Sequence, residues 1–418
     1  NLLFLTLKDL RLFQLVQNLY YALFTSDEGL TADGDANPQD EQRTVMAKVA
    51  KNKNIVFGDA TYRSGVAQFE SNLALILKKL NQAKVPTFIA NLVANEKDQA
   101  PFASVADVDI ENAMRVNRQN AESIEKAKTL KHADYFYWLA QQPHGANKNQ
   151  VAHDYFKIAA NFDVLRFRAP TEFNRIIAEQ AQQHEAILVD VYADFHVYSK
   201  DGIIGFELML EHLHPNSRGY FLIAESFYKA LQSTQFLTPQ YAISQDQAWQ
   251  YSPLHDVDLG FAAHKIERLM ADYPFTDTPK KVPLPAANNE LDSITLARIQ
   301  GKSWMAVQQD LLAYYQANNQ FERAANVAGI LFDALPNRAD LARIASMLYL
   351  RAQVLPMAKY YANHALSLKP ENINYRLTLA EITFKLGDTA AAIDQLNRVL
   401  SIDPNNAIAK QIKQQLNQ

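Results

Sequence analysis

Apolar residues recur with helical spacing over much of the chain, and the first clear case lies between Gly65 and Lys84. The apolar positions there recur at intervals of three or four residues, with one adjacent pair at Ile76 and Leu77; the others are Val66, Phe69, Leu73 and Leu80. This spacing places them on one face of a helix. The apolar run VPTFIANLV that follows at 85–93 ends in polar residues and predicts a buried strand.

A second helix and strand of the same kind come later in the chain. Residues 171–184 predict a helix, and the run AILVDV at 186–191 predicts a strand. A helix followed by a buried strand is half of a βαβ unit, so we expect a parallel sheet with its functional groups at the carboxyl ends of the strands. Residues 105–170 predict a helical insertion, either a generic helical hairpin or one tetratricopeptide-like helix pair.

A 34-residue period occupies the C-terminal part of the chain. Three prolines mark it, each preceded at twelve residues by an alanine: Pro336, Pro370 and Pro404, with Ala324, Ala358 and Ala392. The period, with small residues where two helices cross, is typical of tetratricopeptide repeats. The pattern divides into repeats 305–338, 339–372 and 373–406, with a polar capping helix at 407–418.

A proline-rich segment at 276–292 separates this array from the rest. We therefore predict a partial α/β domain at 1–275, a linker, and an array at 293–418. The expected fold class is α/β plus all-α, the rear part of a doubly wound parallel sheet followed by an α-solenoid. The array predicts a protein partner, because stacked helical repeats form extended binding surfaces.

Charge and composition exclude several function classes. The 41 basic and 45 acidic residues are dispersed along the chain, so the sequence shows no basic cluster of the kind that binds nucleic acid. The absence of cysteine excludes disulfides and Cys-ligated zinc. No glycine-rich phosphate loop is present, so we expect no nucleotide and no cofactor. No apolar run reaches the ~20 residues of a membrane helix, and the apolar opening at 1–24 predicts an amphipathic helix.

The segment EHLHPNSRGYFLIA at 211–224 carries the strongest chemical pattern. Glu211 stands three residues before His214 at the start of a predicted helix, where a carboxylate can fix the tautomer of an imidazole that acts as a general base. A solvated helix N-terminus with a capping histidine is the alternative interpretation. His212 and His214 together favour a metal only weakly, because a hydrolytic zinc site needs a third protein ligand; we expect no metal.

This segment resembles the last motif of SGNH (GDSL-type) hydrolases, Asp-x-x-His-Pro followed by a glycine and a helix. The resemblance implies that His214 is the general base and Glu211 its orienting acid, although the family more often has aspartate there. It also implies a serine-dependent hydrolase that acts on an ester or acylated substrate. The loop ANEKDQAPF at 94–102 resembles one in tetratricopeptide-bearing members, which makes Asn95 a candidate to line the substrate site or a simple turn former. Arg168 is a candidate to orient the cap over that site, or a structural charge.

The family's nucleophile motif has a poor counterpart in this chain. Its nearest match, FGDAT at 57–61, has Ala60 in place of the serine and comes too late in the order of strands. We therefore expect the C-terminal part of a longer hydrolase, inactive by itself, whose array docks a protein. A catalytically degenerate interaction scaffold and an envelope glycan O-acyltransferase or acetylesterase are the alternatives. The envelope is favoured as the location, with the cytoplasm left open.

Overall fold

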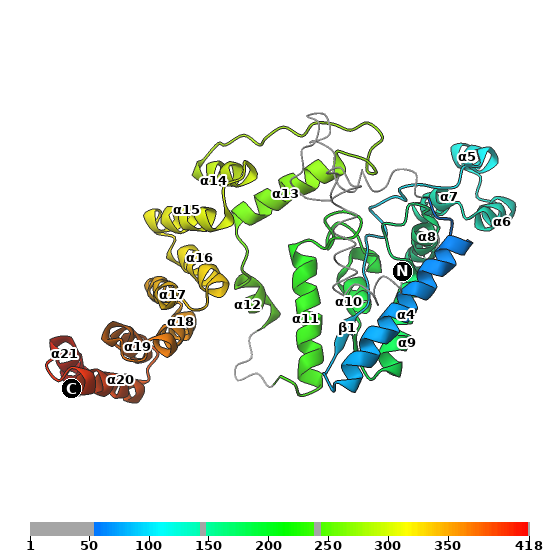
Figure 1. Cartoon of the computed structure of the whole chain (residues 1–418). Helices are drawn as coiled ribbons and strands as arrows, with labels where there is room; N and C mark the ends of the chain where they lie inside the picture. The colour runs from blue at the N-terminus through cyan, green and yellow to red at the C-terminus, as the bar shows by residue number, and fades with distance from the viewer. Residues whose placement is uncertain (1–53, 143–147, 238–243, 417–418) are drawn as a thin grey trace, which may run out of the picture. The chain divides into compact units, whose positions relative to one another are not determined.

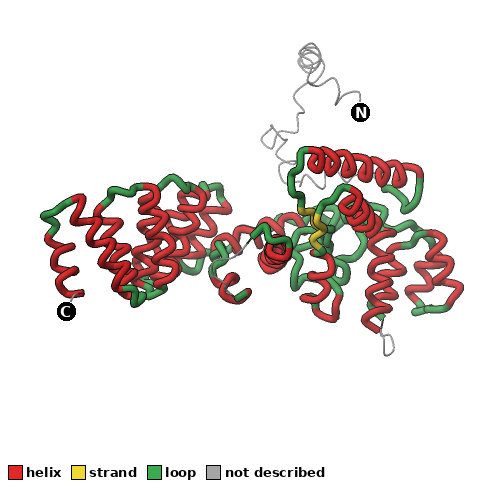
Figure 2. Tube along the Cα trace, turned by 90° about the horizontal axis from the view of Figure 1, so that it is seen from below, coloured by secondary structure: helices red, strands yellow, loops and turns green. Residues whose placement is uncertain are grey.

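The computed structural model describes residues 54–142, 148–237 and 244–416. The predicted amphipathic helix at 1–24 therefore lies outside the described residues. The described chain is mostly helical (Figures 1 and 2). The short segment Ala271–Lys281 belongs to a separate compact unit and forms a turn closed by a hydrogen bond from the Lys280 N–H to the Ala271 carbonyl, 2.9 Å long.

The two predicted strands form one parallel pair, yellow in Figure 2. β1 (Phe88–Ala90) lies beside β2 (Ile187–Val189), with Phe88 opposite Ile187 and Ala90 opposite Val189. The prediction of a parallel pair is confirmed, whereas the prediction of a doubly wound sheet goes beyond the described residues, which form only these two strands.

The apolar run at 203–210 shows why no third strand follows β2 in the described chain. The carbonyl of Ile204 accepts hydrogen bonds from the backbone N–H groups of Glu96 and Lys97, at 2.9 and 3.1 Å. The Leu210 N–H donates to the carbonyl of His214, at 2.8 Å. Because these backbone groups are bonded to loops, they are not available for a regular ladder. The run forms turns around a single antiparallel bridge between Met209 and Pro215.

Helices cover the strand pair from two sides (Figure 1). α4 (Ala60–Gln82) is capped by Asp59, whose carboxylate accepts the Tyr62 N–H at 2.7 Å. It packs on α9 (Thr171–Gln183), where the Phe69 and Phe173 rings stack with centroids 4.3 Å apart, and α9 contacts both strands. α10 (Val191–Tyr198) and α11 (Ser217–Ser233) share a second apolar cluster with β2.

The insertion between the two strands is helical, as predicted. Its helices are α5 (Val108–Arg115), α6 (Ala121–Leu130), α7 (Ala133–Ala140) and α8 (Lys148–Phe162). α7 and α8 pack closely, and Tyr135, Phe136 and Ala159 lie buried in one core. The insertion therefore has an apolar core of its own.

Between α11 and the repeats, the described residues form three helices: α12 (Gln245–Gln250), α13 (Asp256–Met270) and α14 (Glu290–Ile299). α14 begins inside the segment predicted as a linker. Val257 of α13 and Ile294 of α14 are buried in the same apolar cluster as Leu311 of the first repeat. The core of the repeats therefore extends over these two helices.

The C-terminal array consists of helix pairs in the predicted register. The pairs are α15 (Trp304–Ala317) with α16 (Phe321–Ala334), α17 (Ala339–Arg351) with α18 (Leu355–Leu368), and α19 (Ile373–Lys385) with α20 (Thr389–Ile402), and α21 (Ala407–Leu416) follows them. Ala324, Ala358 and Ala392 are fully buried. The small residues that mark the period therefore lie inside the array, where a larger side chain has no room.

Among the described helices, none is both long enough and apolar enough to cross a membrane.

Candidate functional site

The turn at 208–216, which leads into α11, holds the predicted acid and base. The Asn216 N–H donates to the Leu208 carbonyl at 2.9 Å, and the Asn216 side chain caps α11 by accepting the Gly219 N–H at 3.0 Å. Glu211 is fully buried inside this turn, and one of its carboxylate oxygens contacts Nδ1 of His214. The structure therefore brings the two residues together as the sequence spacing predicts.

The carboxylate of Glu211 is surrounded by donors. It accepts the backbone N–H groups of His212 and His214, at 2.9 and 2.7 Å, and it contacts the rings of both histidines. Burial alone would raise the pKa of Glu211, but the hydrogen bonds and charges of His212 and His214 lower it to about 2. The acid is therefore ionised near neutral pH and accepts the Nδ1 proton of His214, while the half-exposed side chain of His214 stays open to solvent.

His212 differs from His214 because it is buried among aromatic rings. Phe102 and Phe167 meet the His212 imidazole edge to face, with centroids 5.0 and 5.9 Å away. The ring planes of His212 and His214 are nearly perpendicular, with centroids 6.4 Å apart. Although both imidazoles contact Glu211, that of His212 is buried in the interior and that of His214 is half exposed to solvent.

Asn95 lies in the loop that follows β1, and Arg168 comes from the segment between α8 and α9. The guanidinium of Arg168 is buried and donates to the carbonyls of Asn95 and Gln99, both at 2.9 Å, and it pairs with Asp163 at 3.2 Å. These bonds hold the loop in place, so the position of Arg168 fits a structural role better than a substrate contact. Its substrate role stays a prediction.

Asn95 is fully buried beneath the His214 turn. Its backbone N–H donates to the carbonyl of His212 at 2.9 Å, and its side-chain oxygen accepts the Asp98 N–H at 3.0 Å. The side-chain amide nitrogen makes no hydrogen bond with the described residues. Asn95 borders a cavity of about 40 Å³ that Arg168 and Tyr192 also line. Asn95 thus joins the loop after β1 to the turn at 208–216. Its contact with substrate stays a prediction.

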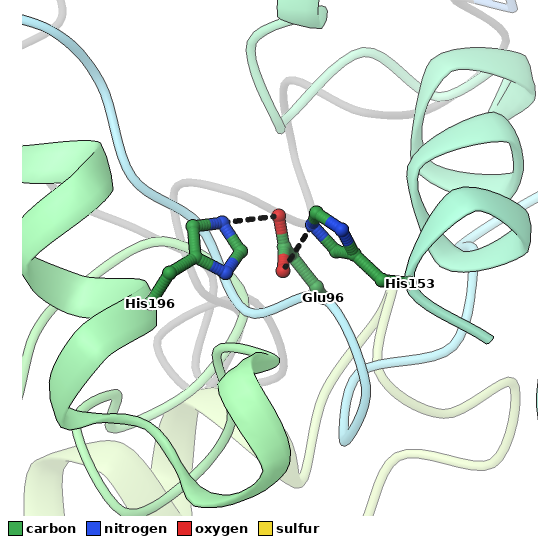
Figure 3. Close-up of side chains that lie close together, drawn as sticks. All are labelled: Glu96, His153 and His196. Carbon is green, nitrogen blue, oxygen red and sulfur yellow. Dashed lines mark ion pairs between the residues drawn. The ribbon is translucent and has the colours of Figure 1, made fainter. Parts of the chain in front are cut away.

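A second group of polar side chains, drawn in Figure 3, includes two residues from the segments that follow β1 and β2. Glu96 comes from the loop after β1, His196 from α10 after β2, and His153 from α8 of the insertion. The carboxylate of Glu96 lies between the two imidazoles, 3.5 Å from Nε2 of His196 and 3.6 Å from Nε2 of His153. Sequence reasoning missed this group because the three residues share no short motif.

The electrostatics of this second group favour an ionised carboxylate. Burial would raise the pKa of Glu96, but the two imidazoles lower it to about 2. Burial likewise opposes the charged form of His196, yet its contact with Glu96 raises the pKa of the imidazole. The hydroxyl of Tyr192 donates to Glu96 at 2.9 Å, and burial together with the Glu96 charge raises the pKa of that hydroxyl. A negative charge is thus held between two histidines.

Comparison with known proteins identifies the C-terminal helices. A family model described as tetratricopeptide repeat matches residues 357–416. The C-terminal region is a tetratricopeptide array. No curated protein matches the chain.

Solved structures similar to this chain include further tetratricopeptide domains. The first tetratricopeptide domain of Spaghetti (RPAP3), bound to an HSP90 peptide, is 20% identical, with a TM-score of 0.25 over 27% of this chain and 89% of that chain. The tetratricopeptide domain of Arabidopsis OM64 is 16% identical, with a TM-score of 0.24 over 27% of this chain and 92% of that one. The APC/C hetero-tetramer Cut9-Hcn1 is 12% identical, with a TM-score of 0.26; the match covers 73% of this chain and 51% of that chain.

Proposed function

We propose that this chain is a protein-interaction module that docks a peptide segment of a partner on its tetratricopeptide array. The observation that carries the proposal is the array itself, three helix pairs in a 34-residue period that share a largely continuous apolar core. Stacked repeats of this kind form extended surfaces that partners use. This function corresponds to the interaction scaffold that the sequence offers as an alternative to a hydrolase.

The N-terminal end of the array offers a hollow of suitable size for a partner's side chain. A cavity of about 160 Å³ is lined by residues of α15 and α16 and by residues 254–256, where α13 begins. Arg323 lies there, more than half exposed, with its guanidinium carbon 5.8 Å from the Tyr315 ring centroid and a nitrogen 3.4 Å from a carboxylate oxygen of Asp256. An exposed pair of this kind holds weakly, so Arg323 is free to exchange Asp256 for an acidic group of a partner.

A selection experiment tests this function. Random peptides displayed on phage are selected against the whole chain, and enriched peptides are synthesised and titrated against wild type and variants. We expect binding that Ala358→Leu abolishes, because a leucine in this fully buried position forces the middle repeat apart. Arg323→Ala should weaken the binding, whereas Gly65→Ala in α4, outside the array, should leave it unchanged. Failure to select any peptide, or binding that is indifferent to Ala358→Leu, would contradict the proposal.

The contact between Glu211 and His214 favours a second candidate function, acyl-ester hydrolysis. An imidazole whose Nδ1 proton is held by a buried carboxylate presents Nε2 as a general base for a serine. A fluorophosphonate ester probe, which labels activated serines, tests this function on the protein in its longest available form. Labelling that disappears in His214→Ala supports the hydrolase. If the wild-type protein is not labelled, the hydrolase function is contradicted and only the interaction function remains.

A further inference from the structure

Glu96, His153 and His196 converge from three segments that are far apart in the sequence. Their potential ligand atoms all lie within 4.8 Å of one another, and Figure 3 shows the carboxylate between the two imidazoles. The histidine side chains are each 17% exposed and that of Glu96 is 8% exposed, so the group is largely screened from water. Side chains this close and this buried need a partner for every polar atom.

The hydrogen bonds around the group orient it for ligation. Nδ1 of His196 lies 2.7 Å from the Gly202 carbonyl. A carbonyl can only accept, so Nδ1 carries the proton and Nε2 can present its lone pair to the centre of the group. Such an outer hydrogen bond accompanies most metal-bound histidines. The two oxygens of Glu96 are held by the Tyr192 hydroxyl at 2.9 Å and the Ile204 N–H at 3.3 Å.

The distances inside the group fit an ion better than direct hydrogen bonds. The separations of 3.5 and 3.6 Å between Glu96 and the two Nε2 atoms exceed the 2.7–3.2 Å of an ordinary N–H···O bond. Around tetrahedral zinc, with bonds of roughly 2.0–2.2 Å, neighbouring ligand atoms stand about 3.3–3.6 Å apart. Both Nε2 atoms are buried and make no hydrogen bond with the described residues. A cation between the three side chains would satisfy them together.

We propose that Glu96, His153 and His196 bind one divalent transition-metal ion of the zinc class. Two imidazole nitrogens and a carboxylate oxygen are a donor set that suits zinc. Three protein ligands leave a fourth position for water. Two of the three residues come from the segments that follow β1 and β2, and open α/β sheets hold their ligands beyond the carboxyl ends of their strands. The ion would also tie the insertion, through α8, to the strand pair.

Zinc binding to the whole chain tests the proposal. The protein is dialysed against a chelator, returned to metal-free buffer and titrated with zinc chloride by calorimetry, and Co²⁺ absorption reports the coordination geometry. We expect one ion per chain and a tetrahedral Co²⁺ spectrum. His153→Ala and His196→Ala should each weaken zinc binding at least about tenfold, because loss of a residue that only hydrogen-bonds to a metal ligand already costs that much affinity. His364→Ala, in the array, is the matched control and should bind as wild type does.

A further variant separates ligand loss from misfolding. Glu96→Gln keeps the size of the side chain and the acceptor for Tyr192 but removes the charge, and it should lose zinc while retaining the wild-type circular dichroism spectrum. The absence of one-to-one binding in the wild type would overturn the proposal. Undiminished binding in Glu96→Gln, or loss only in His214→Ala, would overturn it as well, because the ion would then sit elsewhere.

Discussion

The phenol ring of Tyr361 on α18 lies so close to Gly329 on α16 that a methyl group on Gly329 would stand 2.3 Å from the tyrosine hydroxyl. The ring has little room to move, because it stacks on Tyr349 with centroids 5.6 Å apart and meets Phe332 edge to face. The contact joins two successive helix pairs of the array. The glycine thus allows a close approach that no other residue would permit.

Gly329→Ala should therefore destabilise the array, by about 1–3 kcal/mol as overpacking typically does, despite the better helix propensity of alanine. Urea unfolding measures the change in the free energy of unfolding. Tyr361→Phe removes the nearest atom, so the double variant should recover part of the loss, which a double-mutant cycle quantifies. Additive effects of the two substitutions would show that the ring moves aside freely.

Gly219 supports the turn that holds His214. A methyl group there would meet the Leu208 carbonyl oxygen at 2.3 Å and Cβ of Pro215 at 2.8 Å. Gly219→Ala should displace the turn and lower the melting temperature. Gly65→Ala is the matched control, because nothing lies within 4 Å of its added methyl group in α4. It should stabilise the protein by roughly 0.5–1 kcal/mol. A melting temperature that falls equally in both variants would contradict the prediction.

Arg168 should matter more for stability than an exposed arginine with a similar ion pair. Arg168→Ala leaves Asp163 and several carbonyls buried without their donor, and breaking a buried pair of this kind costs about 3–5 kcal/mol. Arg175, whose pair with Glu179 is exposed, is the control, and Arg175→Ala should change the free energy of unfolding far less, because solvent screens an exposed ion pair. Unfolding curves of the two variants give the comparison, and similar costs would mean that water replaces the guanidinium of Arg168.

The lowered pKa of Glu211 predicts that the folded protein loses stability in acid. Its pKa is lowered from 4.5 to about 2 in the folded protein, so the carboxylate stabilises the fold above pH 4.5 and loses that effect as the pH falls toward 2. Linkage sets the contribution at about 3 kcal/mol near neutral pH. Glu211→Gln should thus destabilise the protein at pH 7, and the difference from wild type should shrink at pH 3. Urea unfolding at both pH values measures it; a constant difference would contradict the prediction.

The sequence predicts best those features that repeat or lie close together along the chain. Ala324, Ala358 and Ala392 could be identified because a fixed period repeats one helix contact three times. Glu211 and His214 are three residues apart, so a single turn decides whether they meet. In both cases the contact is determined by residues of one repeat or one turn, so the sequence pattern is enough to predict it.

Features that depend on distant segments could not be predicted in the same way. Glu96, His153 and His196 are 57 and 43 residues apart and meet only because β1 and β2 pair and α8 folds back over their ends. The prediction of a larger sheet rested on two helix–strand pairs and on the resemblance to SGNH hydrolases, yet the next apolar run, at 203–210, makes its backbone hydrogen bonds with neighbouring loops. An apolar run shows that a segment is buried without showing what its backbone bonds to.

The burial of Val257 and Ile294 beside Leu311 affects how the array can be studied alone. A fragment cut at residue 293 would keep α15 but lose α13, and apolar side chains that α13 covers would meet water. Exposed apolar patches of this kind promote self-association. A soluble, monomeric fragment should therefore start ahead of Asp256, so that the first repeat keeps the helix that closes its open end.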